Sequence, residues 1–154
     1  MFIKKGGAYM FTVKQVLQDK GSDVWTIKPD QTVYSALKLM AEKNLGAVVV
    51  EESGVIKGIF SERDYARRSI SGKVNIKEAK VSDLMTVNLI TASLNETLDQ
   101  CMAMMTDKKI RHIPIIDNGK LVGIISIGDI VNRIISDQEF NLKEMKNYIL
   151  GSTL

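Results

Sequence analysis

The sequence has very few of the residues that build metal centres and disulfides. Its 154 residues include one cysteine, Cys101, and one histidine, His112. One cysteine cannot form a disulfide within the chain, so we expect a reducing compartment, the cytoplasm. A zinc site made of Cys and His would have only these two ligands and would need carboxylates for the rest. The composition therefore argues against a Cys/His metalloenzyme, and we expect no metal site.

Long apolar runs and charge of one sign are also missing. No stretch approaches the roughly 18–20 consecutive apolar residues of a membrane span, so no membrane partner is expected. The net charge is +3, with 21 Lys+Arg and 18 Asp+Glu interspersed. A nucleic-acid binder more often gathers its basic residues in a stripe, so nucleic acid is not an expected partner. The glycine-rich motifs of Rossmann folds and P-loops are absent as well.

The overall composition is that of a soluble globular protein. Hydrophobic residues make up 45% of the chain and charged residues 25%. A chain of this length buries roughly two thirds of its unfolded surface, so it can hold a core without a metal or disulfides.

The chain repeats itself without a gap. Thr32 lies 65 positions before Thr97, and the same shift aligns many glycines, polar residues and apolar residues. The aligned pairs include Gly58 with Gly123, Ser61 with Ser126, and Asp64 with Asp129. The chain is therefore two copies of one unit.

Each copy predicts the same β-α-β-β-α order. Thr32 and Thr97 are typical helix N-caps, and apolar residues follow them at helical spacing. Short β-branched runs and glycine turns then predict two buried strands, and a second helix starts after Ser61 and Ser126. The predicted strands are 24–27, 47–50 and 55–60 in the first copy, and 89–91, 113–116 and 121–125 in the second.

These patterns divide the chain and set its fold class. We expect an N-terminal extension over 1–11, a first repeat over 12–70, a polar linker over 71–80, a second repeat over 81–136 and a helical tail over 137–154. The tail carries apolar residues that suit one face of a helix: Phe140, Met145, Tyr148 and Ile149. The fold class is α/β (α+β), with the two repeats packed pseudo-symmetrically.

Two segments carry a family resemblance. Residues 58–64 and 123–129 resemble the strand-to-helix signature of cystathionine-β-synthase (CBS) domains: Gly, two hydrophobic residues, Ser or Thr, two variable residues, then Asp. Residues 111–115 and 84–86 are similar to that family too. The resemblance covers about residues 12–136, and the two copies in register make it specific.

The resemblance implies a function of regulation rather than catalysis. Tandem CBS domains form one module, the Bateman module, with two clefts that commonly bind AMP, ADP, ATP, NAD(H) or S-adenosylmethionine. Such modules act on another protein as sensors of energy or redox state, and two of them commonly associate into a disc-like homodimer. We therefore expect an adenosyl ligand, a homodimer, a target protein and no enzymatic activity. The alternative is an interaction protein whose clefts are vestigial.

The repeated Ser-x-x-Asp has a physical explanation beside the resemblance. Ser61 and Ser126 each end a strand and begin a helix, where free amides and the helix dipole favour a phosphate. Asp64 and Asp129 follow within the first turn and offer acceptors for the paired hydroxyls of a ribose. The competing interpretation is that serine and aspartate only cap their helices.

The second copy has candidate ligand-binding residues at 111–114, where the first copy has only glycine, alanine and valine at 46–49. Arg111 can pair with a phosphate through its planar fork, and His112 can donate to a phosphate or stack on a base. Pro114 can wall an adenine, and the resemblance adds Ile113 to the set. The alternatives are a solvated cation for Arg111 and a hydrogen-bonded, partly buried imidazole for His112.

The first copy offers cations instead. Arg63 and Arg67 lie near the start of its second helix, and the competing interpretation of both is a solvated helix face. We therefore expect two unequal sites, with the better one involving the second copy.

Two further side chains receive structural interpretations. Cys101 falls on the apolar face of a Met-rich helix and is expected in the core. A Cys101–His112 nucleophile pair lacks a third, orienting group. Trp25 is expected to pack in the core, with stacking on a bound ring as the alternative.

Overall fold

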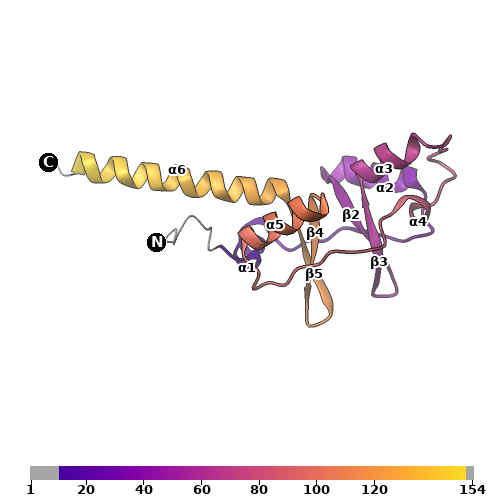
Figure 1. The fold of residues 1–154 in the computed structure, drawn as a ribbon, viewed down its shortest axis with the longest axis horizontal. Helices are drawn as coiled ribbons and strands as arrows, with labels where there is room; N and C mark the ends of the chain where they lie inside the picture. The colour runs from indigo at the N-terminus through magenta and orange to yellow at the C-terminus, as the bar shows by residue number, and fades with distance from the viewer. Residues whose placement is uncertain (1–10, 152–154) are drawn as a thin grey trace.

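The protein, described here by a computed structural model over residues 11–151, consists of two similar halves (Figure 1). The first half contains α1 (Val13–Lys20), β1 (Thr26–Ile27), α2 (Val33–Lys43), β2 (Ala47–Glu52), β3 (Val55–Ser61) and α3 (Glu62–Ser69). The second half contains α4 (Val81–Leu84), α5 (Leu98–Lys108), β4 (His112–Asp117), β5 (Lys120–Ser126) and α6 (Ile127–Gly151). The mixture of helices and small sheets confirms the predicted class. The leading helices α1 and α4 are additions to the predicted unit.

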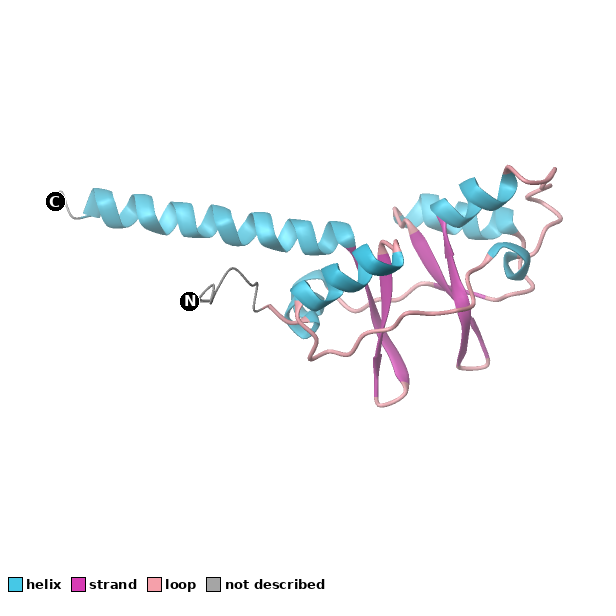
Figure 2. Cartoon of the chain, in the orientation of Figure 1, coloured by secondary structure: helices cyan, strands magenta, loops and turns pink. Residues whose placement is uncertain are grey.

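Each half is built around a β-hairpin, drawn in magenta in Figure 2. β2 pairs antiparallel with β3 and β4 with β5, and both ladders are irregular at the same relative place, next to Val50 and Ile115. Gly54 and Gly119, with φ of 78° and 74°, each follow another residue of positive φ. Two such residues in a row form the type I′ turn whose twist suits a hairpin. The predicted glycine turns are therefore confirmed.

The first half has a third strand where the second half has a single bridge. β1 pairs in parallel with β2 through Thr26 and Ile27. At the corresponding place, Ala92 forms one isolated parallel bridge with Ile115. Of the predicted strand 24–27, only Thr26 and Ile27 form a strand. The predicted strand 89–91 is replaced by a single bridging residue, Ala92, one position later.

Helix α1 belongs to the second half in space. The Val13 amide donates to the Glu96 carbonyl and the Leu98 amide donates to the Phe11 carbonyl, both at 2.9 Å. The buried side chains of this segment join the core of the second half, which includes Phe11, Val13, Val16, Leu17, Leu98, Cys101, Met105, Ile113, Ile115, Ile125 and Ile130. The predicted extension 1–11 therefore ends in a core residue, Phe11. Its residues 1–10 lie outside the described part of the chain.

Helix α4 makes the reciprocal exchange. The Val81 amide donates to the Gln31 carbonyl at 2.8 Å, and the Val33 amide donates to the Ala79 carbonyl at 2.9 Å. Val81 and Leu84 of α4 are buried in the core of the first half. The buried residues of that core are Ile27, Val33, Ala36, Met40, Val48, Val50, Phe60, Val81 and Leu84. Each half is therefore completed by a segment that precedes the other half in the sequence.

Two equivalent glycines let the exchanged segments approach the hairpins. A Cβ built on Gly58 would lie 2.6 Å from the Thr86 carbonyl oxygen, and one on Gly123 would lie 2.7 Å from Leu17 Cδ1. The obstacle at Gly58 is backbone, whereas the obstacle at Gly123 is the end of a flexible side chain.

The two glycines predict unequal costs of substitution. We expect Gly58→Ala to lower the free energy of unfolding by about 1–3 kcal/mol, the usual range for overpacking, and by more than Gly123→Ala. Urea unfolding followed by circular dichroism measures both. Gly72→Ala is the control, because a Cβ there meets nothing within 4 Å. Equal losses for Gly58→Ala and Gly123→Ala would contradict the steric explanation.

The second repeat and the predicted tail share one helix. α6 is continuous from Ile127 to Gly151 and extends far from the rest of the molecule (Figure 1). The predicted boundary at residue 136 is therefore not a break in secondary structure, and residues 152–154 lie outside the described part. Within residues 11–151, no helix is both long enough and apolar enough to span a membrane.

Two single-residue expectations have opposite outcomes. Cys101 is fully buried, as predicted, and burial raises the pKa of its thiol to about 11. Trp25 is 43% exposed, and its ring lies 4.2 Å from the ammonium of Lys43. The prediction of core packing for Trp25 is therefore wrong, because a cation covers one side of the ring and solvent reaches it.

Candidate functional site

A cleft of about 360 Å³ lies between the two halves. One wall comes from the β3–α3 junction of the first half, and the other comes from the α5–β4 junction of the second. The lining residues are Gly46, Ile59, Ser61, Glu62, Arg63, Asp64, Arg67, Arg68, Thr86, Lys108, Lys109, Ile110, Arg111 and His112. Five residues predicted as ligand contacts therefore meet in one place: Ser61, Arg63, Asp64, Arg111 and His112.

Asp64 holds the junction of β3 and α3. Its Oδ2 accepts from the Ser61 amide at 3.0 Å and from the Ser61 hydroxyl at 2.9 Å, and the Asp64 amide donates to Ser61 Oγ at 3.1 Å. Serine and aspartate thus form a capping box, as the competing interpretation predicted. Asp64 Oδ1 accepts from the Thr86 hydroxyl at 3.0 Å. A carboxylate has about four acceptor positions, so Asp64 retains capacity for a ligand hydroxyl.

The amides at the start of α3 are largely occupied. The Glu62 amide donates to the Gly46 carbonyl at 3.1 Å, and the Asp64 amide donates to Ser61. The expectation that these helix amides receive a phosphate is thereby weakened. Side chains around the cleft are the remaining donors for an anion.

Those side chains are strongly basic. Six cationic residues line the cleft against two carboxylates, Glu62 and Asp64. Arg63 and Arg68 are anchored by their Nη1 atoms to the carbonyls of Lys109 (3.2 Å) and Met85 (2.7 Å). The full basic set is Arg63, Arg67, Arg68, Lys108, Lys109 and Arg111. The cleft thus concentrates positive charge in a chain whose net charge is only +3.

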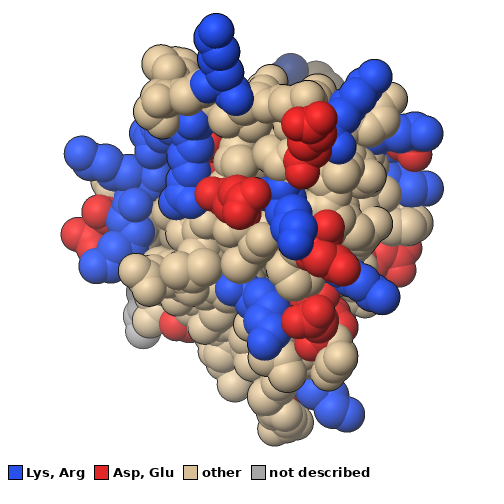
Figure 3. Space-filling view, turned by 90° about the vertical axis from the view of Figure 1, so that its right-hand side faces the viewer, with Lys and Arg blue, Asp and Glu red and all other residues tan. Residues whose placement is uncertain are grey.

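Elsewhere on this end of the molecule the charges are mixed. Figure 3 looks onto the end that carries α2, α3 and α4, and over much of that face Lys and Arg are interspersed with Asp and Glu. Over much of the face in Figure 3, the cations are therefore balanced by nearby carboxylates, unlike those of the cleft.

His112 stands at the seam between the halves. It is half-buried, and a Cβ on Gly46 would lie 2.9 Å from its Nε2, so the absence of a side chain at Gly46 makes room for the imidazole. Burial lowers the pKa of His112, with Lys20 and Arg111 lowering it further and Asp129 and Asp64 opposing them. The imidazole is therefore neutral at neutral pH and can donate from one nitrogen and accept at the other.

This burial predicts a pH dependence of stability. Because folding lowers the pKa of His112 below the ordinary 6.5, the unfolded chain binds the proton more readily. The contribution of the buried neutral imidazole to the free energy of unfolding is therefore complete above pH 6.5. It is lost as the pH falls below that value, because protons then bind the unfolded chain preferentially. Urea unfolding of the wild type between pH 7.5 and 5 measures the loss, and His112→Gln should have a shallower slope. Parallel slopes for the two proteins would contradict this role.

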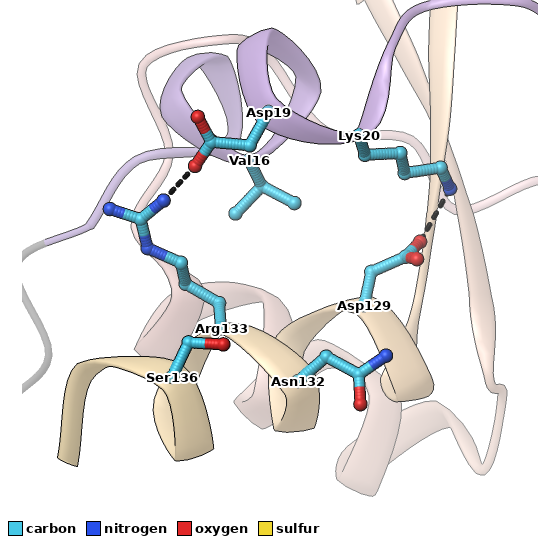
Figure 4. Close-up of a pocket in the computed structure, with 7 residues that line it drawn as sticks. All are labelled: Val16, Asp19, Lys20, Asp129, Asn132, Arg133 and Ser136. Carbon is cyan, nitrogen blue, oxygen red and sulfur yellow. Dashed lines mark hydrogen bonds and ion pairs between the residues drawn. The ribbon is translucent and has the colours of Figure 1, made fainter. Parts of the chain in front are cut away.

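The equivalent residues of the second half face a different partner. Ser126 and Asp129 form the same reciprocal cap, at 2.8 and 3.1 Å. Lys20 from α1, however, places its Nζ 2.5 Å from Asp129 Oδ2 and 2.8 Å from the Ile124 carbonyl (Figure 4). Asp129 lines a separate pocket of about 300 Å³ between α1 and α6. An ion pair between Asp19 and Arg133 closes the other side of that pocket.

The two aspartates therefore have different partners. Asp64 has a neutral hydroxyl partner, whereas Asp129 is neutralised by an ammonium. A ribose that approached Asp129 would have to displace Lys20. The better-formed cleft combines the Ser-x-x-Asp turn of the first half with the arginine and histidine of the second.

Two predicted residues do not reach the cleft. Ile113 is completely buried in the core of the second half, and Pro114 is buried in β4. Strand side chains alternate between faces, and here both faces of β4 are covered. The prediction that Ile113 and Pro114 contact the ligand is corrected: neither lines the cleft.

The cleft also contains residues that received no functional role from the sequence. Thr86 belongs to the family-like segment 84–86, and its bond to Asp64 depends on the exchange of α4 between halves. Lys108 and Lys109 are separated from Arg111 only by Ile110, and these three cations within four residues were an available signal. Among the described residues, no group of three or more His, Cys, Asp or Glu side chains could hold a metal ion.

Comparison with known proteins identifies the class. The model of the CBS domain matches residues 13–71 and 81–136. The chain is 35% identical over 159 residues to the "CBS domain-containing protein CBSX3, mitochondrial" of Arabidopsis thaliana, covering 97% of this chain and 77% of that protein. The chain belongs to the CBS-domain family, and its two halves are a CBS domain pair.

Solved structures share this fold. The CBS-domain containing protein ATU1752 from Agrobacterium tumefaciens has a TM-score of 0.77 and 40% identity, covering 80% of this chain and 98% of that one. The CBS domain pair of protein MJ0100, in complex with 5′-methylthioadenosine and S-adenosyl-L-methionine, has a TM-score of 0.71 and 23% identity, covering 84% and 98%. The MJ0100 pair therefore shows that a protein of this fold can hold two adenosine-containing ligands.

Proposed function

We propose that the cleft between the two halves binds an adenine nucleotide and that the protein is a regulatory module acting on another protein, without catalysis of its own. The observation that carries the proposal is the meeting of Asp64 with six cationic side chains in one cleft. Asp64 offers acceptors for ribose hydroxyls. The six cationic residues that line the cleft, called the basic rim below, supply the positive charge that phosphates require. The adenosyl complex of the MJ0100 pair supports an adenosine ligand for this fold.

The charge of the rim favours ligands with more than one phosphate. Arginine and lysine bind phosphate through charge-assisted hydrogen bonds, and each added phosphate meets another cation of the rim. ATP, ADP and NAD(H) fit this environment better than AMP. S-adenosylmethionine carries a sulfonium cation, which the same rim repels.

The division of the cleft between halves supplies a means of regulation. Ser61 and Asp64 belong to the first half, whereas Lys108, Arg111 and His112 belong to the second. A ligand that contacts both walls binds best when the halves are correctly spaced. It therefore shifts the packing of the pair toward that spacing, provided that it binds the two arrangements with different affinity.

The location of the protein is proposed on simpler grounds. Cys101 is the single cysteine of the sequence and is buried, which suits a reducing compartment such as the cytoplasm.

The choice among nucleotides is testable by isothermal titration calorimetry. We expect ATP and ADP to bind more tightly than AMP, S-adenosylmethionine to bind most weakly, and the affinity for ATP to fall with added salt. Absence of heat with every nucleotide, together with an unchanged melting temperature, would contradict the proposal and favour an interaction protein with vestigial clefts.

The role of Asp64 is testable by a matched pair of variants. Asp64→Asn keeps the shape of the cap but removes the charge, and a hydrogen bond to a charged group contributes about 1.5–3 kcal/mol, so affinity should fall roughly 10- to 100-fold. Asp129→Asn makes the same change in the other half. Calorimetry should show the larger loss for Asp64→Asn. A larger loss for Asp129→Asn would place the ligand beside α6 instead.

A further inference from the structure

The C-terminal half of α6 lies outside both hydrophobic cores. Every residue from 138 to 151 is exposed, and the helix extends away from both cores (Figure 1). An isolated helix of fewer than about 12–15 residues is marginal in water, because most helical stability comes from packing an apolar face. A partner that covers its apolar face would therefore stabilise this segment.

The exposed helix carries an apolar stripe at coiled-coil spacing. Val131, Ile135, Leu142 and Met145 are separated by four, seven and three residues, and are 44%, 48%, 58% and 61% exposed. Gln138 divides the spacing of seven into three and four, so that spacings of four and three alternate along the stripe. Ile149, four residues after Met145, continues this pattern. A repeat of this kind keeps one face of a helix against a partner helix, and a single polar residue in the stripe commonly sets its register.

The charges beside the stripe indicate what the partner is. Glu139 and Lys146 flank the stripe on the same side, seven residues apart, and neither takes part in an ion pair within the described chain. If a second α6 lies antiparallel, with the two-fold axis near residue 143, Glu139 of each helix lies beside Lys146 of the other. A parallel pair would leave both charges facing uncharged residues, Ile134 and Asn141. The pattern is thus complementary to itself.

We propose that α6 binds α6 of a second copy of this chain as an antiparallel pair. Leu142 of one helix packs against Met145 of the other on both sides of the two-fold axis, and the Glu139–Lys146 contacts fix the direction. This site of self-association is independent of the nucleotide cleft.

The test is the mass of the full chain in solution, measured by light scattering over a range of concentrations. The wild type should have at least twice the mass of one 17.1 kDa chain, and Leu142→Lys should lower that mass. Phe140→Lys is the matched control, because Phe140 is equally exposed, at 60%, but lies roughly half a turn away from Leu142. It should leave the mass unchanged. A monomeric wild type, or equal masses for wild type and Leu142→Lys, overturns the proposal.

Charge reversal tests the direction. Glu139→Lys and Lys146→Glu should each weaken association by placing like charges opposite one another, and the double variant should restore it. A double variant that associates as poorly as the single ones overturns the antiparallel arrangement. Both residues are exposed, so none of these substitutions should unfold the domain pair. Thermal unfolding of each variant in a dilute sample is the control.

Discussion

The exchange of leading segments between the two halves is the constraint on which the rest of the structure depends. α1 completes the second core and α4 completes the first, so neither half can close its apolar interior with its own repeat alone. The two hairpins are consequently held at a set spacing, and the cleft between them has walls from both repeats. Thr86 shows the functional result: it arrives with α4, pairs with Ile59 of β3 and donates its hydroxyl to Asp64, so the exchanged segment completes the first-half wall of the cleft.

The same exchange makes the two pseudo-equivalent aspartates different. Asp64 meets a threonine hydroxyl supplied by the segment after α4, whereas Asp129 meets Lys20, the last residue of α1. Both aspartates cap their helices in the same way, so the difference lies in what the exchanged segment brings. A ligand hydroxyl can add to the bonds at Asp64, but it must compete with an ammonium at Asp129. The difference between the two Ser-x-x-Asp sites is thus electrostatic.

Much of the fold was predictable from local patterns. The helix caps, the glycine turns and the β-branched runs act over a few residues, so they appear directly in the sequence. The repeat also placed Ser61 with Asp64 and drew attention to Arg111 and His112, which do meet in one cleft. Ile113 and Pro114 were misplaced because burial depends on what covers each face of β4. Trp25 was misplaced because its ring is covered by Lys43, a contact that apolar patterning does not reveal.

The sequence by itself determined the two-fold repetition, the order of elements and the family, because each depends on residues close together in the chain or on self-similarity. Only the tertiary structure decided which repeat receives each leading helix, which cations gather around Asp64 and which aspartate is already neutralised. Those outcomes depend on contacts between residues as distant as Lys20 and Asp129, whose energies arise only once the chain has closed on itself. The single histidine, His112, lines the cleft at the seam between the halves, and the single cysteine, Cys101, lies in the core.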